Sequence, residues 1–343
     1  MYTKRVRLVN FRNHIDSVYD FQKYNYIQGD NGSGKTSVLE ALYVLFNLKS
    51  FRPQSVNRAI SFNMSFCDIS AKCDDEGHEK TFRYHYDTKA DLKDENGKIS
   101  NKTLYLLNHP VICYSPEFRQ IVSDDQSDRR KFIDRIAFQL DIAHFDRLTE
   151  IKHLNSMKIA ELKKEHHDIT YLDALNEKIV SVSKKVTGAR QCAVGQINEL
   201  LRGFYSLLKD NDGFLLDLRT NTFRTDILAK EITDRRVVYG ASRDKLYCIS
   251  EGRIYDRFSS FGQKKTFVLL TLAAGLKVLE QNGRNGIITF LDDFEAGLDE
   301  NRIRKVFEMF SSSSQIFVTG VKNHYFSDLH SIRIQVKNDE HSQ

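Results

Sequence analysis

The hydrophobic residues near the start of the chain alternate with polar ones, which is the two-residue period of a β-strand. Val6 and Leu8 alternate with basic residues, and the segment from Tyr24 to Ile27 leads directly into a glycine-rich turn. Both segments are therefore predicted to be strands. After the turn, the apolar positions between residues 39 and 46 recur at helical spacing and share one helix face. The predicted order is strand, glycine loop, helix.

Residues 64 to 107 are predicted to form a small antiparallel β region. Apolar residues alternate from Cys67 to Cys73 and again from Phe82 to Tyr86, and the Asn96–Gly97 pair is typical of a hairpin turn. The polar stretch between Asp87 and Lys102 is expected to be the exposed loop of this region.

The pattern becomes helical from about residue 126 to residue 210. Leu172, Leu175 and Ile179 begin a series at three-to-four spacing that continues to Leu208, and the whole stretch lacks proline. A polar break at residues 166–168 predicts two antiparallel helices. The pattern fits a bundle that packs on itself and a short coiled-coil arm equally well.

Patterning typical of an α/β domain returns after residue 213 and ends in a strand from Ile316 to Thr319. We therefore predict an α/β fold, in which a mixed sheet with flanking helices and a small antiparallel β region carries an inserted all-helical lobe. The expected domains are the first part of a head at 1–125, the helical lobe at 126–212, and the second part of the head at 213–343.

The composition sets limits on function. The 343 residues include 51 basic and 46 acidic ones, giving a net charge of +5, which permits nucleic-acid binding without arguing for it. Five cysteines without metal-site spacing suggest reduced thiols in a protein core, and hence the cytoplasm. The longest apolar stretch, Phe267 to Leu279, is too short to span a bilayer and contains Lys277, so no membrane association is expected.

The glycine-rich turn matches the pattern GxxxxGK[ST] in full. This phosphate loop and the serine after it consist of Gly29, Asp30, Asn31, Gly32, Ser33, Gly34, Lys35, Thr36 and Ser37. Glycines let backbone N–H groups curl around phosphate oxygens, and the start of a helix adds partial positive charge. Lys35 is expected to reach the β- and γ-phosphates and to act in catalysis, and Thr36 to bind Mg²⁺. The loop therefore predicts an ATP site; a turn that merely starts a helix leaves the Lys-Thr pair unexplained.

A second motif supplies the carboxylate that such a loop needs. Residues 287–291 are apolar or β-branched and lead into Asp292 and Asp293. At the end of a buried strand, Asp292 is expected to serve Mg²⁺ and Asp293 to polarise the attacking water in catalysis. The alternative is an edge strand that ends in two solvated aspartates.

A third motif lies upstream, where the segment Phe258 to Lys265 precedes an apolar helix predicted from Thr266 to Leu279. Serine and glycine before a helix are also ordinary capping residues. The position favours another interpretation, because a Ser-x-Gly-Gln turn before the strand that ends in the carboxylate is where ABC-type ATPases carry their signature motif. In that class the turn faces the phosphate loop of a second subunit, so Ser260, Gly262 and Gln263 are expected to complete the site in trans.

The residues that follow the carboxylates fit the same class. Gly297, Leu298 and Asp299 follow Asp293 at the spacing of the D-loop. Asp299 equally fits the N-cap of a helix that begins near Glu300, and the two roles are compatible.

Further motifs resemble the RecF family. Asn10 to Asn13, upstream of the phosphate loop, resembles the N-terminal signature of that family and its SMC relatives. Four later segments resemble RecF segments in the same order: Lys49 to Arg52, Tyr114 to Glu117, Asp128 to Asp134, and Tyr239 to Asp244. The helical insertion has no room for the much longer coiled coils of SMC proteins. The resemblance implies that Arg12 and Asn13 lie near the nucleotide, with Arg12 on an exposed turn as the alternative.

The chain also departs from the family and class patterns. Residues 240–244 read Gly-Ala-Ser-Arg-Asp where RecF proteins usually have Gly-Pro-His-Arg-Asp, and no glutamine lies between Cys113 and Phe118 to form a Q-loop. Gly320 stands where transporter ATPases place a switch histidine, and His324 comes four residues late. These departures favour slow hydrolysis, with ATP acting as a switch.

The resemblance implies a DNA-repair ATPase with ATP and Mg²⁺ as cofactors. It would dimerise on ATP, bind double-stranded DNA near single-strand gaps or junctions, and help RecR- and RecO-like partners load recombinase. Residues 129–131, 163–164 and 235–236 are basic and are either DNA phosphate contacts or solvated surface. Two other classes remain open: the ATPase subunit of an ABC transporter, which the missing switch histidine disfavours, and a non-hydrolysing scaffold.

Overall fold

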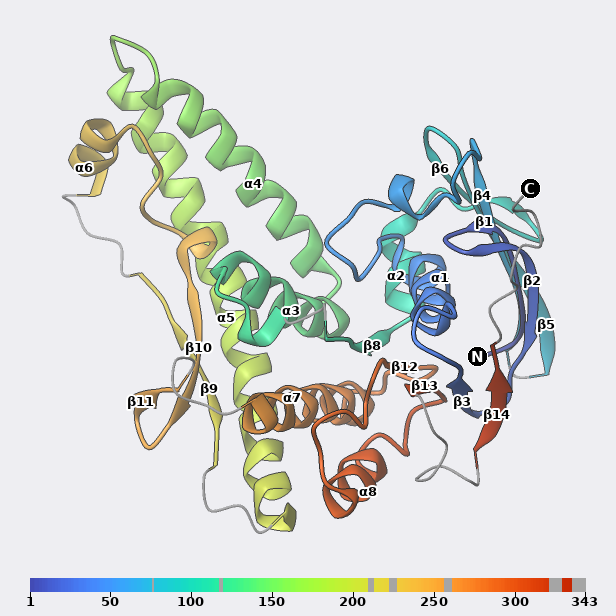
Figure 1. Ribbon diagram of the computed structural model, residues 1–343. Helices are drawn as coiled ribbons and strands as arrows, with labels where there is room; N and C mark the ends of the chain where they lie inside the picture. Colours follow the sequence, from blue (N-terminus) through green and yellow to red (C-terminus); the bar gives the residue numbers. More distant parts are fainter. Residues whose placement is uncertain are drawn as a thin grey trace. The chain divides into compact units, whose positions relative to one another are not determined.

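The computed structural model describes residues 1–75, 77–116, 120–208, 213–221, 227–255, 261–320 and 329–334. The chain divides into two compact units, which are described separately below (Figure 1). The first unit comprises Met1–Arg119, Val268–Leu276 and Gly283–Gln343, and the second comprises Gln120–Phe267 and Lys277–Asn282.

A sheet of five parallel strands forms the centre of the first unit, in the order β14-β3-β13-β12-β8. Its strands are β3 (Tyr24–Gln28), β8 (Val111–Tyr114), β12 (Ile288–Leu291), β13 (Gln315–Gly320) and β14 (His330–Arg333). Every residue of β12 and β13 is buried, as their continuous apolar and β-branched sequences require. Because the strands are parallel, their carboxyl ends share one edge of the sheet, and the segments that follow them meet there.

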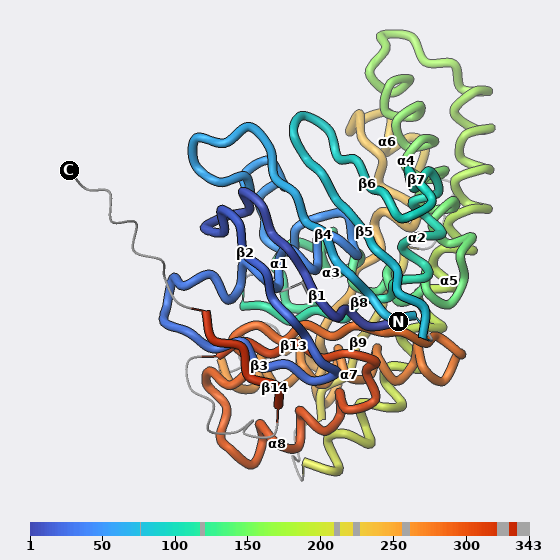
Figure 2. Tube along the Cα trace, turned by 90° about the vertical axis from the view of Figure 1, so that its right-hand side faces the viewer, coloured from blue at the N-terminus to red at the C-terminus, as the bar shows by residue number. Residues whose placement is uncertain are grey.

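An antiparallel sheet of six strands forms the second layer of this unit, in the order β2-β1-β4-β5-β6-β7, as Figure 2 shows. The strands are β1 (Tyr2–Phe11), β2 (His14–Asp20), β4 (Cys67–Asp75), β5 (His78–Tyr86), β6 (Ala90–Asp94) and β7 (Gly97–Lys98). The sequence predicted the hairpin at Asn96–Gly97 but not the pairing of β1 with β4, because a period of two gives no strand partner.

Two details of the predicted β region were wrong. The supposed exposed loop after Asp87 contains β6, in which Leu92 is buried, and residues at the end of the region form helix α2 (Lys102–Asn108). Asn101 caps α2, because its side-chain oxygen accepts a hydrogen bond from the backbone N–H of Leu104 at 2.9 Å. This cap favours a helix at the end of the region, where the alternation of apolar residues is weak.

Helix α1 (Lys35–Asn47) contacts strands of both sheets, β1, β4 and β5 on one side and β8 and β13 on the other. All of its residues from Ser37 to Phe46 are buried, whereas the sequence indicated a single apolar face. The difference follows from the position between two sheets, where a helix needs an apolar surface all round. The fully buried set includes one carboxylate, Glu40.

The remaining elements of the first unit are η1 (Val56–Ala59) and α8 (Glu300–Glu308). Helix α7 (Phe261–Gln281) is divided between the units, and its middle segment, Val268–Leu276, belongs to the first. Within the described ranges, no helix is both long enough and apolar enough to cross a membrane.

The predicted helical stretch lies in the second unit as three helices and not two: α3 (Gln126–Leu140), α4 (Ala143–Leu162) and α5 (Ile169–Leu208). The break between α4 and α5 lies where the sequence placed it, but the break between α3 and α4 was not predicted. With 40 residues, α5 is about 60 Å long at 1.5 Å per residue. The cluster formed by α4 and α5 also includes Tyr239 and Ala241. This third contribution makes the packing that of a bundle and not of an isolated coiled coil.

The second unit is not all-helical, and its extent differs from the predicted lobe at 126–212. It also holds η2 (Gln120–Val122), α6 (Ile227–Asp234), η3 (Ala241–Arg243) and a three-stranded sheet of β9 (Leu215–Arg219), β10 (Lys245–Ser250) and β11 (Arg253–Ile254). The side chain of Asn198 on α5 exchanges two hydrogen bonds of 2.9 Å with the backbone of Leu216 on β9. Such contacts bind the strands to the helices, so the described residues between 213 and 255 belong with the lobe and not with the head.

Arg190 links two of the RecF-like segments within the second unit. It donates two hydrogen bonds, of 2.8 and 2.9 Å, to the carboxylate of Asp134, and one of 2.8 Å to Asp244. Burial raises the pKa of Asp244, but at Asp134 the bonds from His144 and Arg190 outweigh burial and lower the pKa. These segments therefore have a structural role that the sequence did not indicate.

Two predictions about surface chemistry need correction. Arg129 is buried and donates hydrogen bonds to the carbonyl oxygens of Ser123 and Leu246, so it is not surface available to DNA. Four cysteines are buried as expected, and burial raises the pKa of Cys67 to about 12, but Cys192 is exposed on α5. A single cysteine in a helical pattern carries no signal of which face it occupies.

Candidate nucleotide site

The phosphate loop lies between β3 and α1, in the order that the sequence predicted. Gly32 and Gly34 have φ angles of 83° and 102°, in the left-handed region that favours glycine. At Gly29 a Cβ atom would lie 2.4 Å from the carbonyl oxygen of Ile334, so no side chain fits there. The glycines thus allow the tight backbone turn that a phosphate loop requires.

Two side chains of the loop fit a phosphate chain. The ammonium of Lys35 donates hydrogen bonds to the carbonyl oxygens of Gly29 at 2.6 Å and Asp30 at 2.9 Å, which holds it over the loop. The hydroxyl of Ser33 is buried and has no hydrogen-bond partner among the described residues. A buried hydroxyl without a partner is costly, and a phosphate oxygen would satisfy it.

The predicted metal residues are in direct contact with each other. Asp292 follows β12 and accepts hydrogen bonds from the hydroxyls of Thr36 at 2.9 Å and Thr319 at 2.7 Å on one oxygen, and from Ser115 at 3.1 Å on the other. Burial raises the pKa of Asp292, and the neighbouring charge of Asp293 adds to this. A hydroxyl and a carboxylate at this distance are suitable ligands for Mg²⁺.

The backbone of Asp293 is held in an unusual conformation. Its φ angle is 47°, which is uncommon for a residue other than glycine, and its N–H donates to the hydroxyl of Thr319 at 3.0 Å. Strain of this kind is typical of functional sites. The prediction that Asp293 polarises water is compatible with this position beside Asp292.

Ser115 and Thr319 are site residues that sequence reasoning did not single out as such. Each lies at the end of a strand next to β12, and their hydroxyls support Asp292 from two sides. Ser115 lies in the RecF-like segment that begins at Tyr114, which was the available signal. Gln120, the glutamine nearest to that segment, begins η2, and Glu117 and His324 lie outside the described residues.

The first RecF-like segment contacts the phosphate loop and α1. Arg12 donates two hydrogen bonds, of 2.9 and 2.7 Å, to the buried carboxylate of Glu40, which also accepts one of 2.6 Å from Ser50. The side-chain amide of Asn13 donates to the carbonyl oxygen of Ser33 at 3.0 Å. Arg12 is therefore mostly buried in an ion pair and not on an exposed turn; its contact with nucleotide stays a prediction. A carboxylate within the apolar sequence of α1 was the signal for Glu40.

Two of the three predicted signature residues lie in described parts of the second unit. Ser260 is outside the described residues, and Gly262 and Gln263 lie in the first turn of α7. Asp299 caps α8, since its carboxylate accepts a hydrogen bond from the N–H of Arg302 at 2.9 Å. The capping role of Asp299 is confirmed, and the action of all four residues on a second subunit stays a prediction.

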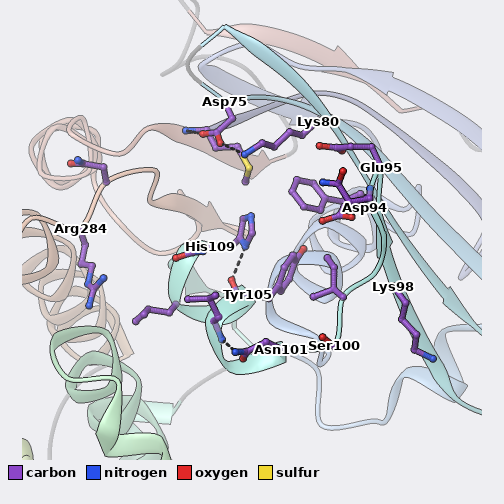
Figure 3. Close-up of a pocket in the computed structure, with 18 of the residues that line it drawn as sticks. Asp75, Lys80, Asp94, Glu95, Lys98, Ser100, Asn101, Tyr105, His109 and Arg284 are labelled. Carbon is purple, nitrogen blue, oxygen red and sulfur yellow. Dashed lines mark hydrogen bonds and ion pairs between the residues drawn. The ribbon is translucent and has the colours of Figure 1, made fainter.

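A cavity elsewhere in the first unit, of about 670 Å³, has different chemistry from the phosphate loop (Figure 3). Its walls include Lys80, Asp94 and Glu95, with Tyr105 and His109 at the centre of the view. Burial lowers the pKa of His109 to about 4, so the ring is neutral at pH 7. Carboxylates in the wall and a neutral histidine do not suit a polyphosphate, so we assign the nucleotide to the phosphate loop.

Fold and site together define a class of protein. A glycine loop, its lysine and threonine, and a carboxylate at the end of a nearby parallel strand form a P-loop nucleotide site. Here they lie in a head with a parallel sheet, an antiparallel sheet and an inserted lobe. The protein is an ABC-type ATPase.

The particular family follows from comparison with known proteins. The family described as RecF/RecN/SMC N terminal domain matches residues 2–343, and the chain belongs to it. Curated relatives named DNA replication and repair protein RecF include one from Cytophaga hutchinsonii, 24% identical over 94% of this chain and 90% of the relative. Another from Leptospira interrogans is 27% identical over 93% and 91%. The resemblance to RecF that the motifs indicated is confirmed.

Solved structures agree on the fold. The recombination mediator protein RecF of the RecFOR pathway, with ATP, has a TM-score of 0.84 at 21% identity, covering 98% of this chain and 97% of the other. An Smc head bound to the C-winged helix domain of ScpA has a TM-score of 0.60 at 14% identity, covering 97% and 94%. The fold is therefore closer to that RecF than to that Smc head.

Proposed function

We propose that this chain is an ATP-dependent DNA-binding protein of replication and recombinational repair that acts in the cytoplasm. The observation that carries the proposal is the direct contact of Thr36 with Asp292, which supports a P-loop site in a chain whose relatives are RecF proteins. One of the similar structures is of a RecF with ATP, which supports ATP as the nucleotide here.

The chain's own residues divide the work at the nucleotide. Backbone N–H groups between Gly32 and Thr36 would bind the β-phosphate, and Lys35 would leave its two carbonyl partners to bind the γ-phosphate. Thr36 and Asp292 would hold Mg²⁺, which neutralises phosphate charge. Asp293 would orient water for attack. We expect slow hydrolysis, well under about 10 per second, because an ATP switch needs a long-lived bound state.

The site would be completed by a second copy of the chain. Ser260, Gly262 and Gln263 would bind the γ-phosphate of the partner subunit's nucleotide, with Asp299 at the same interface. A helix N-terminus favours an anion at that place, and ATP would thus act as the link between two heads. One of the similar structures is of a RecF protein of the RecFOR pathway, which supports RecO- and RecR-like proteins as partners.

DNA binding would be electrostatic and independent of sequence. Exposed basic residues remain at Lys163 and Lys164 after α4 and at Arg235 and Arg236 after α6, although two of them form ion pairs with neighbouring carboxylates. With a net charge of only +5, one subunit offers little attraction for DNA. A dimer doubles the number of phosphate contacts, so we propose that ATP controls affinity for duplex DNA beside single-strand gaps and thereby helps to load recombinase.

Analytical ultracentrifugation tests this proposal. Wild-type protein with ATP and Mg²⁺ is expected to sediment as a dimer and to retain gapped duplex DNA. Lys35→Met removes the phosphate contact and Ser260→Arg blocks the partner's site, so both variants are expected to remain monomers. Lys152→Met, at an exposed lysine on α4, is the matched control for the loss of a positive charge and is expected to dimerise like wild type. Monomers that hydrolyse ATP and ignore DNA would contradict the repair function.

A further inference from the structure

His14, which follows the turn between β1 and β2, contacts the backbone of the phosphate loop. The ring of His14 is buried, and its Nε2 lies 3.3 Å from the carbonyl oxygen of Gly34. Its Nδ1 lies 3.1 Å from the hydroxyl of Tyr19, and the two rings meet edge to face. A hydrogen-bonded chain therefore runs from Tyr19 through His14 to the backbone of the loop.

The partners determine the tautomer of the ring. A carbonyl oxygen only accepts hydrogen bonds, so Nε2 of His14 must carry the proton and donate it to Gly34. Burial lowers the pKa of His14, which keeps the ring neutral and leaves Nδ1 free to accept from the Tyr19 hydroxyl. The carbonyl of Gly34 thus selects the tautomer, and Tyr19 supports it by donating to Nδ1.

The bond from His14 fixes the direction of a peptide group in the loop. The carbonyl of Gly34 and the N–H of Lys35 belong to one planar trans peptide, so they point in opposite directions. Asn13 acts in the same way on the peptide before it, since it binds the carbonyl of Ser33, whose planar partner is the N–H of Gly34. Side chains on one side of the loop therefore direct two N–H groups to the other side.

The side chains of Asn13 and His14 pack directly against the backbone of Gly34. A Cβ atom there would lie 2.7 Å from side-chain atoms of both Asn13 and His14. The carbonyl of Gly34 also accepts the first hydrogen bond of α1, from the N–H of Val38 at 3.1 Å. His14 thus contacts the residue at which the loop becomes a helix.

We propose that His14 is a positioning residue for the triphosphate, supported by Tyr19, and that it presets the N–H of Lys35 toward phosphate. The inference rests on the proposed nucleotide site. In it, His14 and Tyr19 orient the loop for phosphate before ATP binds, without contacting the ligand themselves. Without the bond from His14, the carbonyl of Gly34 keeps only the bond from Val38, so the peptide is held less firmly and ATP binding would have to order it.

Isothermal titration calorimetry with ATP and Mg²⁺ tests the inference on the full-length protein. We expect His14→Leu to weaken ATP binding about 10-fold, which is the loss of roughly one hydrogen bond. His14→Gln keeps an N–H donor at the position of Nε2 and is expected to restore affinity to within about 3-fold of wild type. Tyr19→Phe, which removes only the support of Nδ1, is expected to lie between the two.

The controls separate the possible failures. His85→Leu changes a histidine of the same sheet that pairs with Asp68, and its ATP affinity is expected to match wild type. Thermal unfolding without nucleotide shows whether each variant is folded. If His14→Leu binds ATP like wild type, or if His14→Gln is as weak as His14→Leu, the inference is wrong. A wild-type protein that binds no ATP would instead refute the nucleotide site itself.

Discussion

Replacing Asp292 with asparagine is expected to stabilise the nucleotide-free protein while removing its metal site. The carboxylate of Asp292 is 3% exposed, and no described residue forms an ion pair with it. Burial raises its pKa above the value of about 3.9 in the unfolded chain. The folded state therefore binds the proton more tightly, and stability decreases as pH rises from that value through the raised pKa.

The magnitude follows from the three hydroxyls around Asp292. In Asp292→Asn, the amide oxygen can still accept from Thr36 and Thr319, and the amide N–H can donate to Ser115, so the hydrogen bonds are kept. What disappears is the cost of burying a charge. We expect a gain of about 1 kcal/mol at pH 8, which is a rise of roughly 1–3 °C in melting temperature for a chain of this size.

Thermal unfolding at pH 5 and pH 8, with and without ATP and Mg²⁺, measures both effects. The gain from Asp292→Asn is expected to be at least as large at pH 8 as at pH 5. With ATP and Mg²⁺, wild type should melt at a higher temperature than Asp292→Asn, since only wild type is stabilised by metal-bound ligand. Asp292→Ala is the control, because it leaves three hydroxyls without their acceptor and should destabilise by about 2–3 kcal/mol. If Asp292→Asn melts below wild type at pH 8 without nucleotide, our account of the buried charge is wrong.

Three further predictions concern the loop, a buried ion pair and the thiols. Gly34→Ala should abolish ATP binding in calorimetry and destabilise the fold by more than about 2 kcal/mol, because a Cβ there would collide with neighbouring side chains. Gly77→Ala is the control: its φ of 88° is similar but the space around it is open, so it should cost only about 1 kcal/mol. Lys158 and Glu231 form an ion pair with both side chains fully buried. Lys158→Met alone should therefore lower the free energy of unfolding in urea by about 3–5 kcal/mol, and the double variant Lys158→Met/Glu231→Leu should recover most of this loss. If the single and double variants lose the same stability, the loss does not come from an unpaired buried charge. Iodoacetamide should modify only Cys192 in the folded protein, and mass spectrometry that finds a second labelled thiol would show that the core opens.

Local chemistry in the sequence was sufficient to locate the nucleotide site. The order of strand, glycine loop and helix is a contiguous signal, and the apolar run before Asp292 is another. Helical periodicity likewise located the helical stretch and the break between α4 and α5, because period is a local property, although the break between α3 and α4 was missed. Where neighbouring residues decide the structure, the sequence sufficed.

The strand partners and the lobe boundary were not predictable in this way. An alternating pattern says which face of a strand is buried but not which strand lies beside it, so the six-stranded sheet was predicted only in part. The strands β9 to β11 resembled a return to the head, yet Asn198 binds them to α5. Both differences come from hydrogen bonds between residues that the sequence pattern does not relate.

The sequence by itself predicted a phosphate site, the lysine that would contact the phosphates, and the threonine and aspartate that would hold Mg²⁺, because those residue types at that spacing have few other uses. Only the tertiary structure decided what supports them. Parallel strands bring Ser115 to Asp292 across 177 positions, and the β1–β2 turn brings His14 to the back of the loop. Such contacts depend on the path of the whole chain, since a hydroxyl or an imidazole gains its role only from the group that folding places beside it.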